Sequence, residues 1–87
     1  MPHDETNIAA IRTILRDHGR LAVDVAELQD HSDLYDAGLT SHASVTLMLG
    51  LEEHFNVEFP ERMLRRSTFA TINSIRAAIE ELTGAST

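Results

Sequence analysis

The sequence predicts a small all-α protein, a bundle of three main helices, one short helix and a long first loop. Three observations support this fold class. Apolar residues recur at helical spacing in three separate segments. Residues that commonly cap or stop helices flank those segments. Hydrophobic residues make up 43% of the 87 residues, enough for one compact core, so residues 1–87 are expected to form a single domain.

The first helix is expected to run from about Thr6 to His18. Asp4 or Thr6 can cap its N-terminus, and Gly19 is a suitable stop after its last residue. Its core side is expected to comprise Ile8, Ile11, Ile14 and Leu15.

The segment from Arg20 to Leu39 follows neither helical nor strand periodicity and is expected to be a long loop. A short helical turn is predicted near Asp24–Leu28. The loop residues expected to point inward are Val23, Leu28 and Leu34. Its polar residues suggest a calcium loop, but their spacing does not match an EF-hand and no Glu closes it at the required place. They are Asp30, Ser32, Asp33 and Asp36, and no metal site is predicted there.

The second helix is expected from about Ser41 to Phe55, after a turn at Ala37-Gly38. Its core stripe comprises Leu47, Met48, Leu51 and Phe55. The other side comprises His42, Val45, Thr46, Leu49 and Glu53. Two of these residues are apolar and lie near the serine that begins the helix, which favours a docking surface. Gly50 costs about 1 kcal/mol relative to Ala inside a helix, and it could permit close approach of a partner or of another helix, or be a product of neutral drift.

The C-terminal part is expected to begin with a short helix. Pro60 biases Phe59 toward an extended conformation and can start a helix over Glu61–Arg66. A basic cluster lies there, which we expect either to pair with the acidic loop or to form a second partner contact. The cluster comprises Arg62, Arg65 and Arg66.

The last main helix follows a link over Ser67–Ala70, in which Phe69 is expected to be buried. Thr71 caps the helix, which runs to about Leu82, and Gly84 ends it. Its core stripe comprises Ile72, Ile75, Ile79 and Leu82.

The composition argues against several functions. The net charge is −7, and the chain between Leu21 and Glu61 carries many acids but no Arg. Such a field repels nucleic acid and anionic membranes and attracts basic partners; the alternative explanation of the charge is solubility alone. No apolar run is long enough to cross a bilayer, and the first residues have no signal-peptide pattern. With no Cys in the chain, these features predict a cytoplasmic protein that binds neither nucleic acid nor membrane.

The side chains suggest neither a catalytic nor a metal site. The histidines form no pair at ligand spacing; they are His3, His18, His31, His42 and His54. Ser41 has no recognisable triad, because His42 is expected to point outward and no acid is placed to orient it. The protein is therefore not expected to be an enzyme.

Ser41 has two alternative roles at the start of its helix. Its hydroxyl could cap the free amides of the first turn, a contribution of about 1 kcal/mol, although Thr40 could serve equally well. Alternatively, Ser41 could carry a phosphate, which the free N–H groups and the positive end of the helix dipole would stabilise.

The segment from Asp36 to Pro60 resembles the acyl carrier protein family, including the related peptidyl carrier domains. Gly38-Leu39-Thr40-Ser41 has the family's spacing, with a Gly three residues before the serine that begins the second helix. The downstream pattern is also similar, with Val45, Leu47, Leu51-Glu52-Glu53, Phe55 and Phe59-Pro60. The resemblance implies an acyl-carrier-like bundle in which a separate phosphopantetheinyl transferase esterifies Ser41 with 4′-phosphopantetheine from coenzyme A. The thiol of that arm would hold an acyl or aminoacyl group as a thioester and present it to partner enzymes.

Three positions depart from the family's usual residues. Thr40 stands where Asp is usual, His42 where Leu or Met is usual, and Thr46 where an acid is common. These residues lie on the face that partners contact, which favours a specialised pathway. The run Thr-Ser-His-Ala-Ser-Val is similar to discrete carriers that ligases related to seryl-tRNA synthetases load with an amino acid. We therefore expect an aminoacyl carrier first, and a nonribosomal peptide, polyketide or fatty acid carrier next.

The resemblance also implies partners: the transferase, an acyl- or amino-acid-activating ligase and a downstream acceptor enzyme, each binding a monomer. The expected docking residues are Thr40, His42, Val45, Thr46, Leu49 and Glu53. The alternative function is an unmodified acidic helical adaptor that binds a basic partner through Val45, Leu49 and Glu53.

Overall fold

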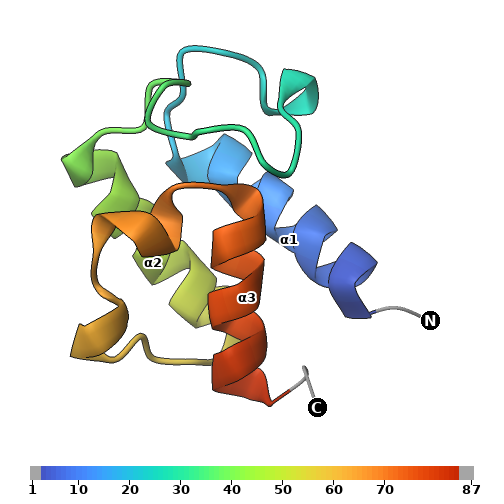
Figure 1. Ribbon diagram of the computed structural model, residues 1–87, viewed down its shortest axis with the longest axis vertical. Helices are drawn as coiled ribbons and strands as arrows, with labels where there is room; N and C mark the ends of the chain where they lie inside the picture. Colours follow the sequence, from blue (N-terminus) through green and yellow to red (C-terminus); the bar gives the residue numbers. More distant parts are fainter. Residues whose placement is uncertain (1–2, 85–87) are drawn as a thin grey trace.

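The computed structural model describes the backbone of residues 3–84 and the side chains of residues 7–84. Within that range it has no strand and three α-helices, α1 (His3–His18), α2 (Ser41–Phe55) and α3 (Ile72–Thr83). The connections contain three short 3-10 turns, η1 (Val25–Glu27), η2 (Glu61–Met63) and η3 (Arg66–Phe69). α1 packs against both α2 and α3, and the loop over residues 19–40 crosses the ends of the helices (Figure 1). The all-α fold class is confirmed.

The core is aliphatic and all three helices contribute to it. Its largest fully buried side chains are Ile11, Leu15, Leu34, Leu47, Leu51, Ile72, Ile75 and Ile79. Residues that the helical spacing also assigned to the core lie at its edge, partly buried: Ile8, Met48, Phe55 and Leu82. The predicted core stripes of the three main helices are therefore confirmed.

α1 begins earlier than the sequence analysis predicted. Its first residue is His3, so the two expected caps, Asp4 and Thr6, lie inside the helix. The earlier start is compatible with the sequence, because neither Pro nor Gly occurs between His3 and Ile8. The stop is confirmed, because the Gly19 N–H donates to the carbonyl of Leu15 at 2.7 Å directly after the helix.

α1 and α2 approach closely at Gly50. A Cβ atom added to Gly50 would lie 2.9 Å from Cδ2 of His18 and 3.0 Å from Cγ2 of Ile14. Both distances are too short for an ordinary carbon contact. Gly50 therefore serves the packing of two helices, one of the three explanations that the sequence left open.

Arg12 of α1 fixes the long loop to the bundle. Its guanidinium donates to the carbonyl oxygens of Val25 and Leu28 at 3.0 and 2.9 Å, and to Oδ1 of Asp30 at 2.8 Å. These bonds satisfy backbone acceptors that no regular secondary structure would pair. The loop consequently has a defined path despite its irregular sequence.

The turn expected near Asp24–Leu28 is confirmed as η1, but the prediction that Val23 points inward is wrong. Asp24 caps η1 by accepting a backbone N–H at 3.0 Å. This tight turn directs Val25 into the core and leaves Val23 40% exposed. Two other loop residues point inward as expected, Leu34 and, more partly, Leu28.

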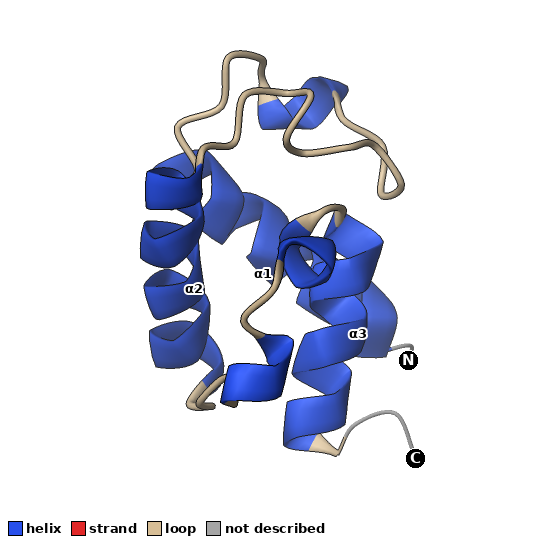
Figure 2. Cartoon of the chain, turned by 60° about the vertical axis from the view of Figure 1, so that its left-hand side comes forward, coloured by secondary structure: helices blue, strands red, loops and turns tan. Residues whose placement is uncertain are grey.

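The short helix expected over Glu61–Arg66 is instead a pair of 3-10 turns. Leu64 (φ −85°, ψ 67°) and Arg65 (φ −139°, ψ 160°) leave the helical region and separate η2 from η3. The break allows Met63 before it and Phe69 after it to be buried together. η3 therefore occupies most of the expected link, and Figures 1 and 2 both show it between α2 and α3.

The ends of α3 agree closely with the prediction. Thr71 Oγ1 accepts the N–H of Ser74 at 2.9 Å, and Ser74 Oγ accepts the N–H of Thr71 at 3.0 Å, which forms a capping box. Gly84 ends the helix in the left-handed region, with φ 74°.

Candidate functional site

Thr40, not Ser41, caps the start of α2. Thr40 has an extended backbone (φ −101°, ψ 166°), and its Oγ1 accepts the N–H of Ala43 at 3.0 Å. Its carbonyl accepts the N–H of Ser44 at 2.8 Å. The structural role considered for Ser41 is therefore already filled by its neighbour.

Ser41 is the first residue of α2 and is exposed. Within residues 7–84 no hydrogen bond engages its hydroxyl, although its carbonyl accepts from Ser44 Oγ at 2.7 Å. The first turn contains no acid, and the N–H groups of Ser41 and His42 lie too early in the helix for an intrahelical acceptor. The hydroxyl is thus accessible beside unneutralised positive charge.

The turn before α2 requires Gly38. Its φ is 112°, in the region that favours glycine, and an added Cβ would lie 2.7 Å from the backbone nitrogen of Ala22. The Ala22 N–H donates to the carbonyl of Ala37 at 2.9 Å, and the side chains of Ala37 and Leu39 are buried. This close packing of two loop segments fixes the position from which Ser41 is presented.

A groove of about 280 Å³ opens beside Ser41. One wall comes from the first half of α2, and the other from the segment between η2 and the end of η3, with one residue from the preceding loop. The lining residues are Tyr35, Ser41, Ser44, Val45, Met48, Leu64, Arg65, Arg66 and Phe69. The groove therefore joins an exposed hydroxyl, an apolar floor and two cationic side chains, and its lining contains no carboxylate.

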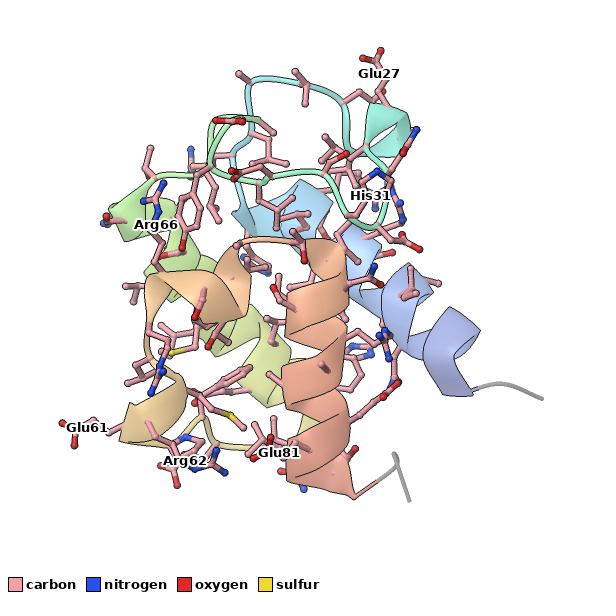
Figure 3. The ribbon with its side chains drawn as sticks, in the orientation of Figure 1. Glu27, His31, Glu61, Arg62, Arg66 and Glu81 are labelled. Carbon is pink, nitrogen blue, oxygen red and sulfur yellow. The ribbon has the colours of Figure 1, made fainter. Side chains whose placement is uncertain are left out.

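Tyr35 and Arg66 meet at this groove. The guanidinium carbon of Arg66 lies 3.7 Å from the Tyr35 ring centroid, and the Tyr35 hydroxyl donates to the Arg66 carbonyl at 3.2 Å. Figure 3 shows Arg66 near the first turn of α2. Burial raises the pKa of the Tyr35 phenol, the charge of Arg66 lowers it, and that of Asp33 raises it.

The basic cluster does not pair with the acidic loop as expected. Arg62 instead forms an ion pair with Glu81 of α3 at 2.6 Å, and Arg65 Nε donates to the carbonyl of Arg62 at 2.9 Å. Arg66 reaches the loop through a tyrosine ring rather than a carboxylate. The break after Met63 explains why the arginines have separate partners. Because the three arginines do not lie on one continuous helix, their side chains point in different directions.

The docking residues predicted on α2 lie outside the core. Val45 and Leu49 are 52% and 55% exposed. The polar members are exposed or, for Thr46, half-buried: Thr40, His42, Thr46 and Glu53. The sequence analysis missed Leu64, which is 49% exposed and shares the groove with Val45. The sequence shows only that Leu64 is an apolar residue in the middle of Glu61–Arg66. A regular helix over that stretch would not have placed Leu64 beside α2.

In the part of the chain whose side chains are described, exposed Ser41 has no partner that could act as a base. His42 is exposed as well, and neither residue has a hydrogen-bonded carboxylate among the described residues. No group of three metal-ligating side chains occurs in that part of the chain, and none of its helices is long and apolar enough to span a membrane. The fold and the site thus define a small helical protein that presents an exposed serine hydroxyl at the start of a helix, beside a groove.

The family model for the phosphopantetheine attachment site matches residues 9–79, so the chain belongs to this family. It is a carrier protein that holds its cargo on a 4′-phosphopantetheine arm, as the sequence analysis predicted. The chain is 49% identical to the aminoacyl carrier protein of Agrobacterium fabrum over 72 residues, 83% of this chain and 87% of that protein. It is 40% identical to a D-alanyl carrier protein of Streptococcus pyogenes over 60 residues, 68% and 75% of the two chains.

The chain is also similar to solved structures that contain a carrier protein. One is a complex of an engineered Bradyrhizobium japonicum glycine:[carrier protein] ligase with a carrier protein from Agrobacterium tumefaciens and ATP. This match has a TM-score of 0.84 and 47% identity, and covers 86% of this chain and 97% of the other. A solution structure of a protein from Agrobacterium tumefaciens matches with a TM-score of 0.73 and 44% identity, over 91% of this chain and 95% of the other. These relatives agree with the expected aminoacyl subtype.

The residues at the start of α2 fit the arm. The arm attaches through a phosphodiester, which carries one negative charge and needs hydrogen-bond donors but no metal. The free N–H groups of Ser41 and His42 supply donors at the helix start, and Arg65 and Arg66 add positive charge to the groove that Ser41 also lines.

Proposed function

We propose that Ser41 is the attachment residue and that the arm carries an amino acid as a thioester. The observation that supports this most is the division of roles at the helix start. Thr40 performs the capping, so the hydroxyl of Ser41 is left exposed and has no hydrogen bond among the described residues. A serine retained only for helix stability would be expected to make the capping bond itself.

This chain's residues contribute position and electrostatics rather than catalysis. The transferase would activate the Ser41 hydroxyl, whose oxygen forms a bond to phosphorus while the adenosine bisphosphate part of coenzyme A leaves. The bound arm then supplies a thiol, which the protein itself lacks because it has no Cys. The role of the fold is to hold the first turn of α2 still, and we propose that the chain is not itself an enzyme.

The proposed loading partner is an ATP-dependent amino acid:[carrier protein] ligase. The structurally similar carrier from Agrobacterium tumefaciens is bound to a ligase of that description, which supports the proposal. The exposed apolar side chains Val45 and Leu64, which line the groove with Ser41, offer a surface for it, and Leu49 lies one helical turn beyond Val45 on α2. A phosphopantetheinyl transferase and a downstream acceptor enzyme complete the proposed cycle, which we place in the cytoplasm, where coenzyme A and ATP are available. We propose that the carrier binds these partners as a monomer and binds neither nucleic acid nor membrane.

Intact mass spectrometry tests the attachment. Purified protein is incubated with coenzyme A, magnesium and a broad-specificity phosphopantetheinyl transferase, and one added phosphopantetheine is expected. Ser41→Ala should abolish the addition. Ser44→Ala, which removes a hydroxyl from the same helix face, should retain it. No addition with any of several transferases would overturn the proposal and favour the unmodified adaptor.

The cargo is tested on the holo protein. Candidate ligases are supplied with ATP and single amino acids, and the product is treated with hydroxylamine, which releases a thioester. A hydroxylamine-labile aminoacyl mass increase is expected. If only carboxylic acids without an amino group were accepted, the aminoacyl assignment would be wrong while the carrier function would stand.

A further inference from the structure

The two arginines in the groove, Arg65 and Arg66, differ from the arginines that form ion pairs. Four side chains, those of Arg12, Arg16, Arg62 and Arg76, lie within ion-pair distance of a carboxylate. Within residues 7–84, Arg65 and Arg66 have no carboxylate partner, although the chain has twice as many acids (14) as basic residues (7). In a chain of net charge −7, two guanidinium groups that line one groove and have no carboxylate partner among the described residues create a local site for an anion.

Both guanidinium groups also keep hydrogen-bond donors available. Arg65 donates through Nε to the carbonyl of Arg62, which leaves its two terminal nitrogens without a partner among the described residues. Arg66 contacts Tyr35 through the face of its guanidinium, so the N–H groups at the edge remain available. The Tyr35 hydroxyl bonds the Arg66 carbonyl and thereby holds this residue at the groove.

The position of the groove determines which anion can reach these donors. Ser41 lines the groove together with Arg65 and Arg66. A phosphorus atom attached to Ser41 would be bonded directly to Oγ, so its free oxygens would lie at the same edge of the groove. Beyond that edge the floor is apolar, formed by Val45, Met48, Leu64 and Phe69. Such a floor suits the two methyl groups that follow the phosphate in pantetheine.

We propose that Arg65 and Arg66 form the binding site for the phosphodiester of the arm and seat the first part of the arm in the groove. This inference rests on the proposed attachment at Ser41. A phosphodiester held by guanidinium groups gains charge-assisted hydrogen bonds, which are about twice as strong as neutral ones. The seated arm would project its thiol from a fixed point beside α2 instead of sampling all directions around the serine.

NMR on the full chain tests the proposal. Apo and holo samples are compared after the added mass has been verified, so failure of the attachment itself is recognised first and is a separate result. Holo minus apo differences are expected at residues 64–69, at Tyr35 and at the Arg65 and Arg66 Nε–H signals, as well as at residues 40–44. Differences restricted to residues 40–44 in a fully modified sample would overturn the proposal.

Variants of the arginines provide the second readout. In holo Arg65→Gln and holo Arg66→Gln, the phosphorus resonance should move toward that of a phosphopantetheinyl-serine peptide, and the differences at residues 64–69 should diminish. Arg62→Gln is the matched control, because that arginine pairs with Glu81 and does not line the groove. Arg65→Gln leaves the contact between Arg66 and Tyr35 in place, so a loss of fold in one variant does not decide the result. An equal effect of Arg62→Gln, or no effect of either groove variant, would contradict a specific phosphate site.

Discussion

The guanidinium of Arg66 lies 3.7 Å from the ring centroid of Tyr35, and the Tyr35 hydroxyl donates to the Arg66 carbonyl at 3.2 Å. Tyr35 belongs to the loop before α2, and Arg66 begins η3. Their contact therefore joins the two chain segments that flank Ser41 in space, although they are distant in sequence.

The ionisation of Tyr35 gives the first prediction. Burial raises the pKa of the phenol, Arg66 lowers it and Asp33 raises it, and the net pKa lies above the ordinary value of about 10. Arg66→Gln removes the only lowering contribution, so we expect a further increase. Tyr35 is the only Tyr and the chain has no Trp, so ultraviolet absorbance follows this one group. A pKa below 10, or a decrease in Arg66→Gln, would contradict the assigned contact.

The same shift predicts how stability depends on pH. A raised pKa in the folded state means that folding favours the protonated phenol, so this contribution is complete below about pH 10 and is lost as the pH rises through the folded-state pKa. The chain has no Lys or Cys, so no other side chain should titrate near that pH. Urea unfolding at pH 9 to 12 should show the loss in the native protein and not in Tyr35→Phe.

Replacing Thr40 or Ser41 should separate capping from attachment. Thr40→Ala removes the acceptor of the Ala43 N–H and should reduce the free energy of unfolding by about 1 kcal/mol, whereas Thr40→Ser should preserve it. Ser41→Ala removes a hydroxyl that has no hydrogen bond among the described residues, so stability should change by less than about 0.5 kcal/mol. Urea denaturation of the unmodified variants measures both. A larger loss in Ser41→Ala than in Thr40→Ala would restore the capping role of the serine.

Arg12 should be the residue on which the order of the long loop depends. Arg12→Gln breaks its contacts with two carbonyls and with Asp30, and should cost about 2 kcal/mol because partly buried acceptors lose their donors. Arg16→Gln on the same helix is the control. Its partner is the exposed neighbour Asp17, so an effect below about 0.5 kcal/mol is expected. Hydrogen exchange should be faster across residues 22–34 in Arg12→Gln alone, and equal exchange in both variants would contradict this role.

Gly50→Ala tests the contact between α1 and α2. Alanine favours a helix over glycine by about 1 kcal/mol, but the new methyl group would collide with Ile14 and His18. Overpacking of this kind commonly costs about 1–3 kcal/mol, so we expect a net loss of stability of about 1 kcal/mol. Thermal or urea unfolding measures it. A gain in stability would mean that Gly50 serves a partner's approach and not the packing of the two helices.

The features that could be predicted from the sequence depend on local interactions. The bounds of α2, the cap at Thr71 and the core stripes follow from residues one or two helical turns apart, whereas the sequence left the cap of α2 open between Thr40 and Ser41. Val23 was misplaced because an irregular loop has no period, and the bonds that direct Val25 inward come from a distant residue, Arg12. Local patterns cannot encode such contacts.

The two parts of the site, Ser41 and the groove, also differ in whether they depend on local or on distant contacts. Ser41 could be predicted as the attachment residue from its spacing to Gly38 and to the downstream motif, all within one short stretch, and that assignment stays a prediction. The groove could not, because it also requires Tyr35 and the segment around Leu64, and the break between η2 and η3 that turns Leu64 toward α2 has no clear sequence signal. The arginines were noticed as a cluster, but their different partners depend on that same break.

The exposed apolar residues beside Ser41 give the last prediction. If Val45, Leu49 and Leu64 contact the loading ligase, truncation of a central one should weaken the complex by more than 1 kcal/mol, roughly a tenfold decrease in kcat/KM for loading. Leu49→Ala tests the face predicted from the sequence, and Leu64→Ala tests the addition made by the structure. Both side chains are about half exposed, so neither change should unfold the bundle, which circular dichroism verifies.

Val23→Ala is the matched control for these two variants. Val23 is also a substantially exposed apolar residue, at 40%, but it lies in the long loop and does not line the groove beside Ser41. Its loading rate should remain within a factor of about two of the native rate, since surface truncations away from a contact have small effects. If Leu64→Ala also loaded normally while Leu49→Ala did not, the ligase would contact α2 without the segment before η3. If all three variants lost activity equally, the effect would be one of general surface hydrophobicity rather than of a defined docking surface.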